Sequence, residues 1–178
     1  MRKIAAIFVV LLIFCTVSSA FASDDDRPSK YGLRFLLFRP VDGDLRNVTD
    51  SNWIGAGVDI YLKKDEDDRP TRYVSLGYVS SGDGFVKGKI YPLTYTIVNR
   101  RPISADRNSY RAIGAGIYSL KLESPSLSRS SFKPGLNLAY GQEVKDTYFG
   151  ELRVDLIPEF ETFQWTSISL NIGTRVSL

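Results

Sequence analysis

Residues 168–178 read ISLNIGTRVSL, and this stretch decides which classes of fold the chain can form. Aliphatic residues occupy positions 168, 170, 172, 176 and 178, whereas Ser, Asn, Gly and Arg fill the odd positions between them. Successive side chains of a β-strand point to opposite faces of the sheet. The spacing therefore predicts a strand with one apolar face and one polar face.

A second stretch, YFGELRVDL at residues 148–156, shows the same alternation with a stronger contrast. Glu151, Arg153 and Asp155 lie on one face of the predicted strand, and the opposite face is apolar. In a soluble barrel or sandwich the apolar face points into the core. In a transmembrane barrel that face points to lipid, and the polar face lines the lumen. Alternation alone leaves both architectures open.

Eight segments of this kind follow one another after residue 30, separated by clusters of Gly, Pro, Asn and Asp. No stretch between them has the period of a helix. The predicted strands run from Tyr31 to Phe38, Trp53 to Lys63, Thr71 to Ser80, Phe85 to Val98, Tyr110 to Leu122, Phe132 to Gln142, Thr147 to Ile157 and Trp165 to Leu178.

Three features of these segments favour the transmembrane architecture. Most segments reach the roughly 9 to 11 residues that a tilted spanning strand needs, and their number is even, as an up-and-down bacterial barrel requires. Aromatic residues near segment ends suggest the girdle found at membrane interfaces. We therefore predict an all-β fold, an antiparallel up-and-down eight-stranded transmembrane β-barrel over residues 31–178. The aromatic residues in question are Tyr31, Trp53, Tyr73, Tyr110, Tyr148 and Trp165.

The N-terminus predicts export. Arg2 and Lys3 precede an apolar run from Ile4 to Phe14, and small residues lead to a cleavage site before Ser23, as in a secretory signal peptide. The apolar run is shorter than the roughly 20 residues of a membrane-spanning helix. Residues 1–22 are thus expected to be removed, residues 23–30 to form a short flexible segment, and the mature protein to lie in the outer membrane.

Composition excludes several kinds of chemistry. The chain has no histidine, which rules out Ser-His and Cys-His catalysis and histidine-ligated zinc or haem. Its single cysteine, Cys15, lies in the predicted signal, so no disulfide and no cofactor is expected. Loss of Arg2 and Lys3 leaves 21 basic and 20 acidic residues, a formal net charge of +1, which gives no reason to expect a nucleic-acid partner.

The word Ile-Gly-Ala-Gly occurs twice, with its glycines at 55 and 57 and again at 114 and 116. A dinucleotide-binding loop needs a third glycine and a helix that opens at the glycines, and neither copy has them. We interpret both copies as strand, with glycines that leave room in a narrow lumen and aliphatic residues that face lipid.

Six charged residues fall on the polar phase of their segments and are expected to meet in the lumen. Three are acidic and three basic, so they can neutralise one another as a salt-bridged plug. A proton or ion pathway, or a ligand site, is the alternative. Closure of the barrel predicts that Glu151 or Asp155 lies near Arg175 or Arg34. The six residues are Arg34, Asp59, Glu151, Arg153, Asp155 and Arg175.

Two irregularities need an explanation within this pattern. Pro92 lies inside the fourth segment and cannot donate a ladder hydrogen bond, so we expect a bulge or a strand end there. In the fifth segment Leu120 and Leu122 leave the apolar phase of Ile113 and Ile117, which suggests a bulge near Tyr118.

The connections should face opposite sides of the membrane in turn. With both termini on the periplasmic side, those at 39–52, 81–84, 123–131 and 158–164 face outward, and a long connection at 99–109 lies inside.

The C-terminus carries the one motif that resembles a known family. Asn171, Gly173, Val176 and Leu178 fit the spacing of the signal read by the barrel-assembly machinery, with Leu178 in place of the usual aromatic residue. With its architecture, the chain resembles small eight-stranded outer-membrane β-barrel proteins of the OmpX/OmpW-like class. The resemblance implies outer-membrane lipid and the assembly machinery as partners of a monomer. The enzymes of this class use a histidine that the chain lacks.

These observations lead to a main hypothesis and two alternatives. The first is a non-enzymatic integral outer-membrane protein that acts through its external loops or as a narrow passage. The second is a soluble periplasmic β-barrel that binds a small apolar ligand, and the third is a lipid-modifying enzyme. The first two predict opposite directions, outward or inward, for the side chains of Leu152, Val154, Ile168, Leu170 and Ile172.

Overall fold

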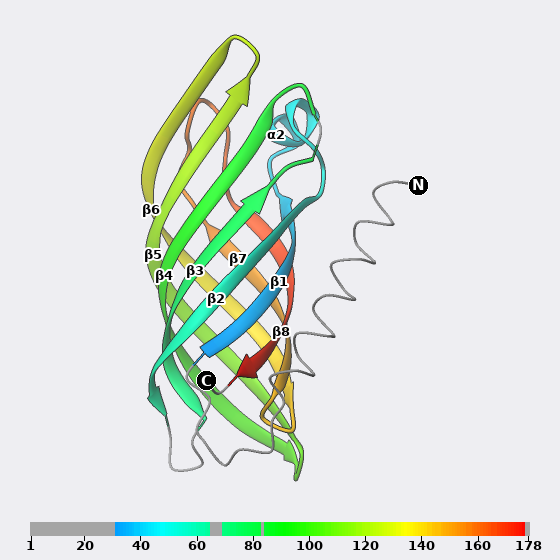
Figure 1. Cartoon of the computed structure of the whole chain (residues 1–178), viewed down its shortest axis with the longest axis vertical. Coiled ribbons are helices and arrows are strands. Elements are labelled where there is room, and N and C mark those ends of the chain that lie inside the picture. The colour runs from blue at the N-terminus through cyan, green and yellow to red at the C-terminus, as the bar shows by residue number, and fades with distance from the viewer. Residues whose placement is uncertain (1–30, 65–68, 83, 177–178) are drawn as a thin grey trace.

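The computed structural model describes residues 31–64, 69–82 and 84–176, and these form a closed antiparallel barrel (Figure 1). Each strand pairs with the next in the chain, and β1 pairs with β8 to close the ring. The predicted fold class, an all-β eight-stranded antiparallel barrel, is confirmed. The strands are β1 (Tyr31–Pro40), β2 (Trp53–Lys64), β3 (Pro70–Ser80), β4 (Lys87–Ser104), β5 (Arg107–Ser124), β6 (Leu127–Val144), β7 (Tyr148–Leu156) and β8 (Ser167–Val176).

One short helix, α2 (Gly43–Val48), lies in the connection between β1 and β2, so the expectation of no helix between the strands is wrong there. Six residues are too few to show a helical period in the sequence. In the part of the chain that the structure describes, no helix is both long enough and apolar enough to span a bilayer. The predicted signal peptide, the segment 23–30 and Leu178 lie outside the described residues.

The wall of the barrel is apolar on its outside and polar on its inside. Leu152 and Leu170, which pair across β7 and β8, are 55% and 51% exposed, and Val154, two residues further along β7, is partly exposed. Their strand neighbours Glu151 and Arg153 are 2% and 5% exposed. The outward direction predicted for the five aliphatic residues is therefore confirmed, and a soluble barrel with an apolar core predicted the opposite.

The two ends of the barrel differ in their connections (Figure 1). The end that carries the C-terminus, here called the terminal end, holds the turns β2–β3, β4–β5 and β6–β7. The other end, the loop end, holds α2, the β3–β4 and β7–β8 connections and the tip of the long β5–β6 hairpin. The longer connections in the described chain gather at the loop end.

Two predicted connections are wrong, because the strands continue through them. β4 runs to Ser104 and β5 begins at Arg107, so the expected long connection 99–109 is a two-residue turn. Likewise β5 ends at Ser124 and β6 begins at Leu127. The polar residues around these two turns are typical of loops, but their backbones pair as hairpins that extend beyond the apolar belt.

The bulge or strand end expected at Pro92 is also wrong. Pro92 pairs with Tyr118 of β5 in a regular register. On the other side the β3–β4 pairing stops after Leu76 and resumes at Val79 without a shift. The missing N–H of proline thus interrupts a ladder without displacing it, and Gly77 leaves space for the ring, because a Cβ there would lie 3.0 Å from Pro92 Cγ.

No bulge occurs near Tyr118, since β5 pairs with both neighbours there without a register shift. Leu120 and Leu122 instead share the inward phase of Tyr118 and are buried. The apparent slip in the sequence reflects a change in what fills the lumen, from polar side chains in the middle of the barrel to apolar ones at the loop end.

The predicted aromatic girdle is wrong at four of its six positions. Trp53, Trp165, Tyr73 and Tyr110 are buried inside the barrel. Tyr148 does face outward, and Tyr31 is half-buried. The exposed aromatic residues on the outer wall include Tyr78, Tyr91, Tyr95 and Tyr140.

The repeated Ile-Gly-Ala-Gly lies in β2 and β5 as predicted, with its aliphatic residues outward. The glycines face the lumen. A Cβ at Gly57 would lie 3.3 Å from Cγ of Arg34, and one at Gly114 only 2.7 Å from Nδ2 of Asn137. At both positions a Cβ would come even closer to a backbone carbonyl oxygen of the neighbouring strand, 2.9 Å from that of Leu76 at Gly57 and 2.5 Å from that of Tyr95 at Gly114, so both need glycine.

Candidate functional site

The lumen is the candidate site, because it collects most of the buried polar groups of the described chain. Along the barrel axis it has an apolar cluster at the loop end, a charged layer in the middle, and an aromatic cluster with further ion pairs at the terminal end. We call the loop-end cluster the apolar plug. It comprises Phe38, Leu45, Trp53, Val79, Ile90, Tyr118, Leu120, Leu122, Ile157, Phe160 and Trp165.

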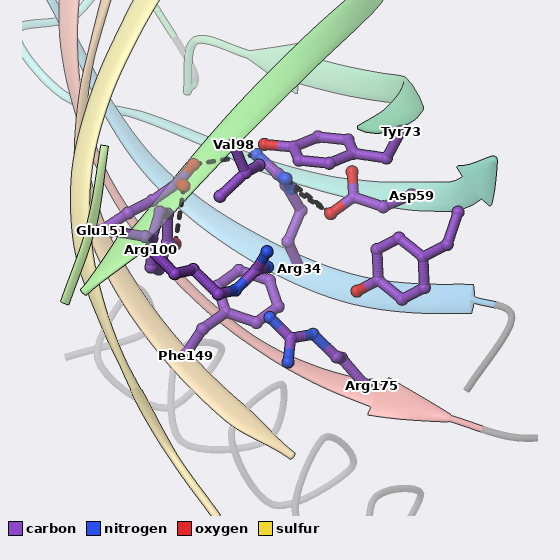
Figure 2. Close-up of a pocket in the computed structure, with 10 residues that line it drawn as sticks. Arg34, Asp59, Tyr73, Val98, Arg100, Phe149, Glu151 and Arg175 are labelled. Carbon is purple, nitrogen blue, oxygen red and sulfur yellow. Dashed lines mark hydrogen bonds and ion pairs between the residues drawn. The ribbon is translucent and has the colours of Figure 1, made fainter. Parts of the chain in front are cut away.

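Arg34 forms the centre of the charged layer (Figure 2). Its Nη2 lies 2.5 Å from Oδ2 of Asp59 on β2, and its Nη1 lies 3.0 Å from Oε1 of Glu151 on β7. The guanidinium also lies over the rings of Tyr73 and Phe149, at 5.6 and 5.7 Å from their centroids. The buried guanidinium of Arg34 on β1 thus links β2 to β7, which lie on opposite sides of the β1–β8 pairing that closes the barrel.

Uncharged side chains donate further hydrogen bonds to the carboxylates of Asp59 and Glu151. The Ser75 hydroxyl donates to Oδ1 of Asp59 at 2.5 Å. The Tyr110 hydroxyl donates to Oε2 of Glu151 at 2.8 Å, and the Asn171 amide donates to Oε1 at 3.0 Å. Burial of a charge is tolerated when it is paired and hydrogen-bonded in this way.

A second ion pair joins Arg153 and Asp155, two residues apart on the inward face of β7. Arg153 Nε lies 3.0 Å from Asp155 Oδ1, which also accepts a hydrogen bond from the Tyr118 hydroxyl at 2.7 Å. Tyr118 belongs to the apolar plug, so this pair connects the plug to the charged layer.

A third ion-pair group lies at the terminal end and centres on Glu143 of β6, which is fully buried. Its Oε1 accepts from Arg100 Nε at 2.7 Å, and its Oε2 lies 2.9 Å from Arg175 Nη2. Arg175 Nη1 also donates to the backbone carbonyl of Asp146 at 2.9 Å. Glu143 and Arg100 are not among the predicted lumen residues, because both fall in predicted connections and not in predicted strands.

The six predicted lumen residues are all buried, but they do not form one cluster. Glu151 contacts Arg34, one of the pairings expected from closure of the barrel. Asp155 pairs with Arg153 of its own strand, and Arg175 pairs with Glu143. With Glu143 and Arg100 added, these eight side chains carry four negative and four positive formal charges and are neutral in total. The extra negative charge of the Arg34 group is offset by the extra positive charge of the Glu143 group.

The apolar plug closes the loop end. The Trp53 ring stacks on Phe38 at a centroid distance of 5.4 Å and meets the edge of Trp165 at 5.8 Å. Gly88 makes room for Trp53, because a Cβ at Gly88 would lie 2.2 Å from that ring. Leu45 of α2 is fully buried among these residues, so the helix acts as part of the plug.

Asp42 fixes α2 to the β7–β8 connection. Its Oδ1 accepts from the backbone N–H groups of Asp44 and Leu45, as an N-cap does, and its Oδ2 accepts from the N–H of Gln164 at 2.7 Å. The hydrogen bonds from Leu45 and Gln164 lower the pKa of the Asp42 carboxyl below its usual value.

Little open space remains in the lumen. The two spaces lined by lumen residues measure about 20 and 30 Å³, enough for a water molecule or two each. Within the described residues no group of three or more acidic, cysteine or histidine side chains is arranged to hold a metal ion. The arrangement can hold the strands together, but it offers no room for a solute in this conformation.

Asn171, Gly173 and Val176 of the predicted assembly signal lie on β8, and Leu178 lies outside the described residues. Asn171 is fully buried and donates to Glu151, and a Cβ at Gly173 would lie 2.1 Å from the ring of Phe149. Val176 is buried and pairs with Tyr31. Two of these residues thus have a packing role in the folded barrel, and their recognition during assembly stays a prediction.

Comparison with known proteins gives structural likeness without sequence likeness. No protein-family model and no curated protein matches the chain. Among solved structures it is similar to Neisserial surface protein A (TM-score 0.61, 10% identity), over 83% of this chain and 96% of that one. It is also similar to a de novo designed transmembrane β-barrel (TM-score 0.50, 10% identity), over 85% and 99%. At such identities the likeness shows the fold, that of small eight-stranded outer-membrane barrels.

Proposed function

We propose that the chain is a non-enzymatic integral protein of the outer membrane that acts through its loop end. The observation that carries this proposal is the inverted polarity of the wall. Leucines on the outside are about half exposed, while charged side chains on the inside are buried and paired. Water on the outside would leave a continuous apolar belt exposed, whereas lipid stabilises it.

The ends of the chain and the fold support the same proposal. A predicted export signal precedes the barrel, and the C-terminal strand has the spacing read by the barrel-assembly machinery. A closed ring leaves no unpaired strand edge, which is what lets a β-structure cross a bilayer and lets this one work as a monomer.

A role for the loop end is better supported than a role as a passage. The apolar plug and the charged layer fill the lumen, and spaces of only about 20 and 30 Å³ are lined by lumen residues. The loop end, by contrast, presents α2 and the long β5–β6 hairpin beyond the apolar belt (Figure 1).

The experiment that tests membrane insertion compares boiled and unboiled samples of the purified protein by SDS gel electrophoresis after membrane fractionation. We expect the protein in the membrane fraction and a band that shifts on boiling, because a closed barrel resists SDS until heated. A Leu152→Asp and Leu170→Asp double variant should lose both properties, since each charge on the lipid face costs about 2 kcal/mol or more. The matched control places the same charges at exposed polar positions, Ser128→Asp and Ser130→Asp at the tip of the β5–β6 hairpin. Wild-type protein that stays in the soluble fraction without a heat shift contradicts the proposal.

A further inference from the structure

The outer wall of the β4–β5 hairpin carries a cationic groove near the terminal end. Two arginines, an asparagine and a tyrosine surround a space of about 330 Å³ on the face that points away from the lumen. Apart from Tyr110, whose ring lies in the lumen and whose hydroxyl donates to Glu151, these side chains take no part in the polar contacts of the lumen. The residues that line the groove are Asn99, Arg101, Ser109, Tyr110, Arg111 and Tyr140.

The strand register places this groove directly below the apolar belt. On the outer face the last apolar cross-strand pair is Ile97 with Ile113, both about half exposed. The next pair toward the terminal end on the same face is Asn99 with Arg111, and the following one is Arg101 with Ser109. Cationic groups therefore begin where the aliphatic surface ends.

The position of the groove at the edge of the apolar belt can be checked from the distance to the opposite edge. The first cationic pair toward the loop end is Lys89 with Lys121, and Lys89 lies ten positions before Asn99. Ten residues span roughly 33 Å along a strand. At the usual tilt of barrel strands this is about 25 Å across the membrane, the height of an outer-membrane apolar belt. The groove thus lies at a lipid–water interface.

The cations at the two edges of the apolar belt differ in whether a carboxylate neutralises them. Lys89 and Lys121 both pair with Glu123, at 2.5 Å each. Within residues 31–64, 69–82 and 84–176, neither Arg101 nor Arg111 forms an ion pair with a carboxylate. Arginine presents a planar fork of donors that matches a phosphate, and two such forks beside an amide suit one phosphodiester.

We propose that this groove binds the headgroup phosphate of one anionic phospholipid from the leaflet at the terminal end. Arg101 and Arg111 contact the phosphate, Asn99 donates to the headgroup, and the acyl chains run along Ile97 and Ile113. The inference rests on the proposed function, because the site needs a barrel placed in a bilayer.

The test reconstitutes the full barrel in vesicles of phosphatidylcholine with phosphatidylglycerol as the minor lipid. The barrel is extracted in mild detergent, and the lipid that remains bound is counted by native mass spectrometry. Wild-type protein is expected to retain one phosphatidylglycerol per barrel. Arg101→Gln and Arg111→Gln together should weaken retention by about tenfold for each arginine removed, as for loss of a charge-assisted hydrogen bond. The lysine variants Arg101→Lys and Arg111→Lys keep the charge but lose the fork and should retain lipid to an intermediate degree.

A matched control removes two exposed cations from the same end of the barrel. Lys63→Gln and Arg72→Gln change a cross-strand pair of β2 and β3 and should leave retention unchanged. Equal loss in both double variants, or equal retention of the two lipids by the wild type, overturns the site. The heat-dependent gel shift is measured on the same samples. A shifted, inserted barrel without selective retention refutes only the lipid site, whereas failure to insert refutes the proposed function and the site together.

Discussion

A guanidinium held between two carboxylates distinguishes Arg34 from the arginines on the outer wall. Asp59 and Glu151 are both within 3.0 Å of it, and all three side chains are buried. A buried ion pair adds little net stability compared with apolar packing, but removal of one partner leaves an uncompensated charge. Arg34 therefore matters mainly because its loss would leave the buried carboxylates of Asp59 and Glu151 without a cation.

Arg34→Met should lower the free energy of unfolding by about 3–5 kcal/mol, because Asp59 and Glu151 would remain buried without a cation. Urea unfolding in lipid vesicles, followed by the fluorescence of Trp53 and Trp165, measures the effect. Arg39→Met on the same strand is the matched control, since Arg39 is exposed and a change there should stay within about 0.5 kcal/mol.

The triple variant Arg34→Met, Asp59→Asn, Glu151→Gln removes the stranded charges and should recover most of the loss. A single Arg34→Met variant as stable as the wild type would contradict the bridging role of this cation.

At the element scale, the alternation within each strand predicts more than a lipid-facing stripe, because it also indicates on which side of the wall an aromatic ring lies. Trp53 shares the inward phase of Gly55 and Gly57, and Tyr110 shares that of Gly114. Phase alone therefore indicates that these rings lie in the lumen, although their nearness to strand ends suggested a girdle. The extra length of β4 and β6 gave no comparable signal, because their hairpins have polar residues on both faces. Glu143 and Arg100 could not be predicted for that reason.

The attachment of α2 at the loop end should depend on pH through Asp42. Hydrogen bonds from the N–H groups of Leu45 and Gln164 lower the pKa of Asp42 in the folded protein. The stabilisation is therefore complete above the unfolded pKa, about 3.9, and is lost as the pH falls through the lower folded value. Amide hydrogen exchange at Leu45 should accelerate in acid beyond its intrinsic pH dependence.

Asp42→Asn keeps one acceptor, Oδ1, for the helix cap, loses the acceptor for the N–H of Gln164, and should remove this pH dependence. Asp42→Ala removes both acceptors and should weaken the helix attachment by about 1 kcal/mol at neutral pH. Asp44→Asn, in the first turn of the same helix, is the matched control. An unchanged pH profile in Asp42→Asn would show that another group controls the opening.

For the whole molecule, the lumen has two barriers in series. The apolar plug closes the loop end, and the ion-paired layer with the aromatic cluster closes the middle and the terminal end. The first excludes ions because it is apolar, and the second because each of its charges is already paired. Either barrier alone is sufficient to stop an ion, so their effects on conductance should not add.

Planar-bilayer recordings should therefore show no ion conductance for the wild-type barrel. Trp53→Ala with Trp165→Ala opens only the plug, and Arg34→Gln with Asp59→Asn and Glu151→Gln loosens only the charged layer, so each set alone should stay silent. The two sets combined with Tyr110→Ala and Phe149→Ala, which remove two rings of the aromatic cluster, should give discrete current steps, because the plug, the charged layer and the aromatic cluster are then all opened. Phe132→Ala, which removes an aromatic ring from the outer wall, is the control for general loosening and should not conduct. Insertion of every variant is verified by the heat-dependent gel shift, and steady conductance of the wild type would favour the passage over the loop end as the working part of the protein.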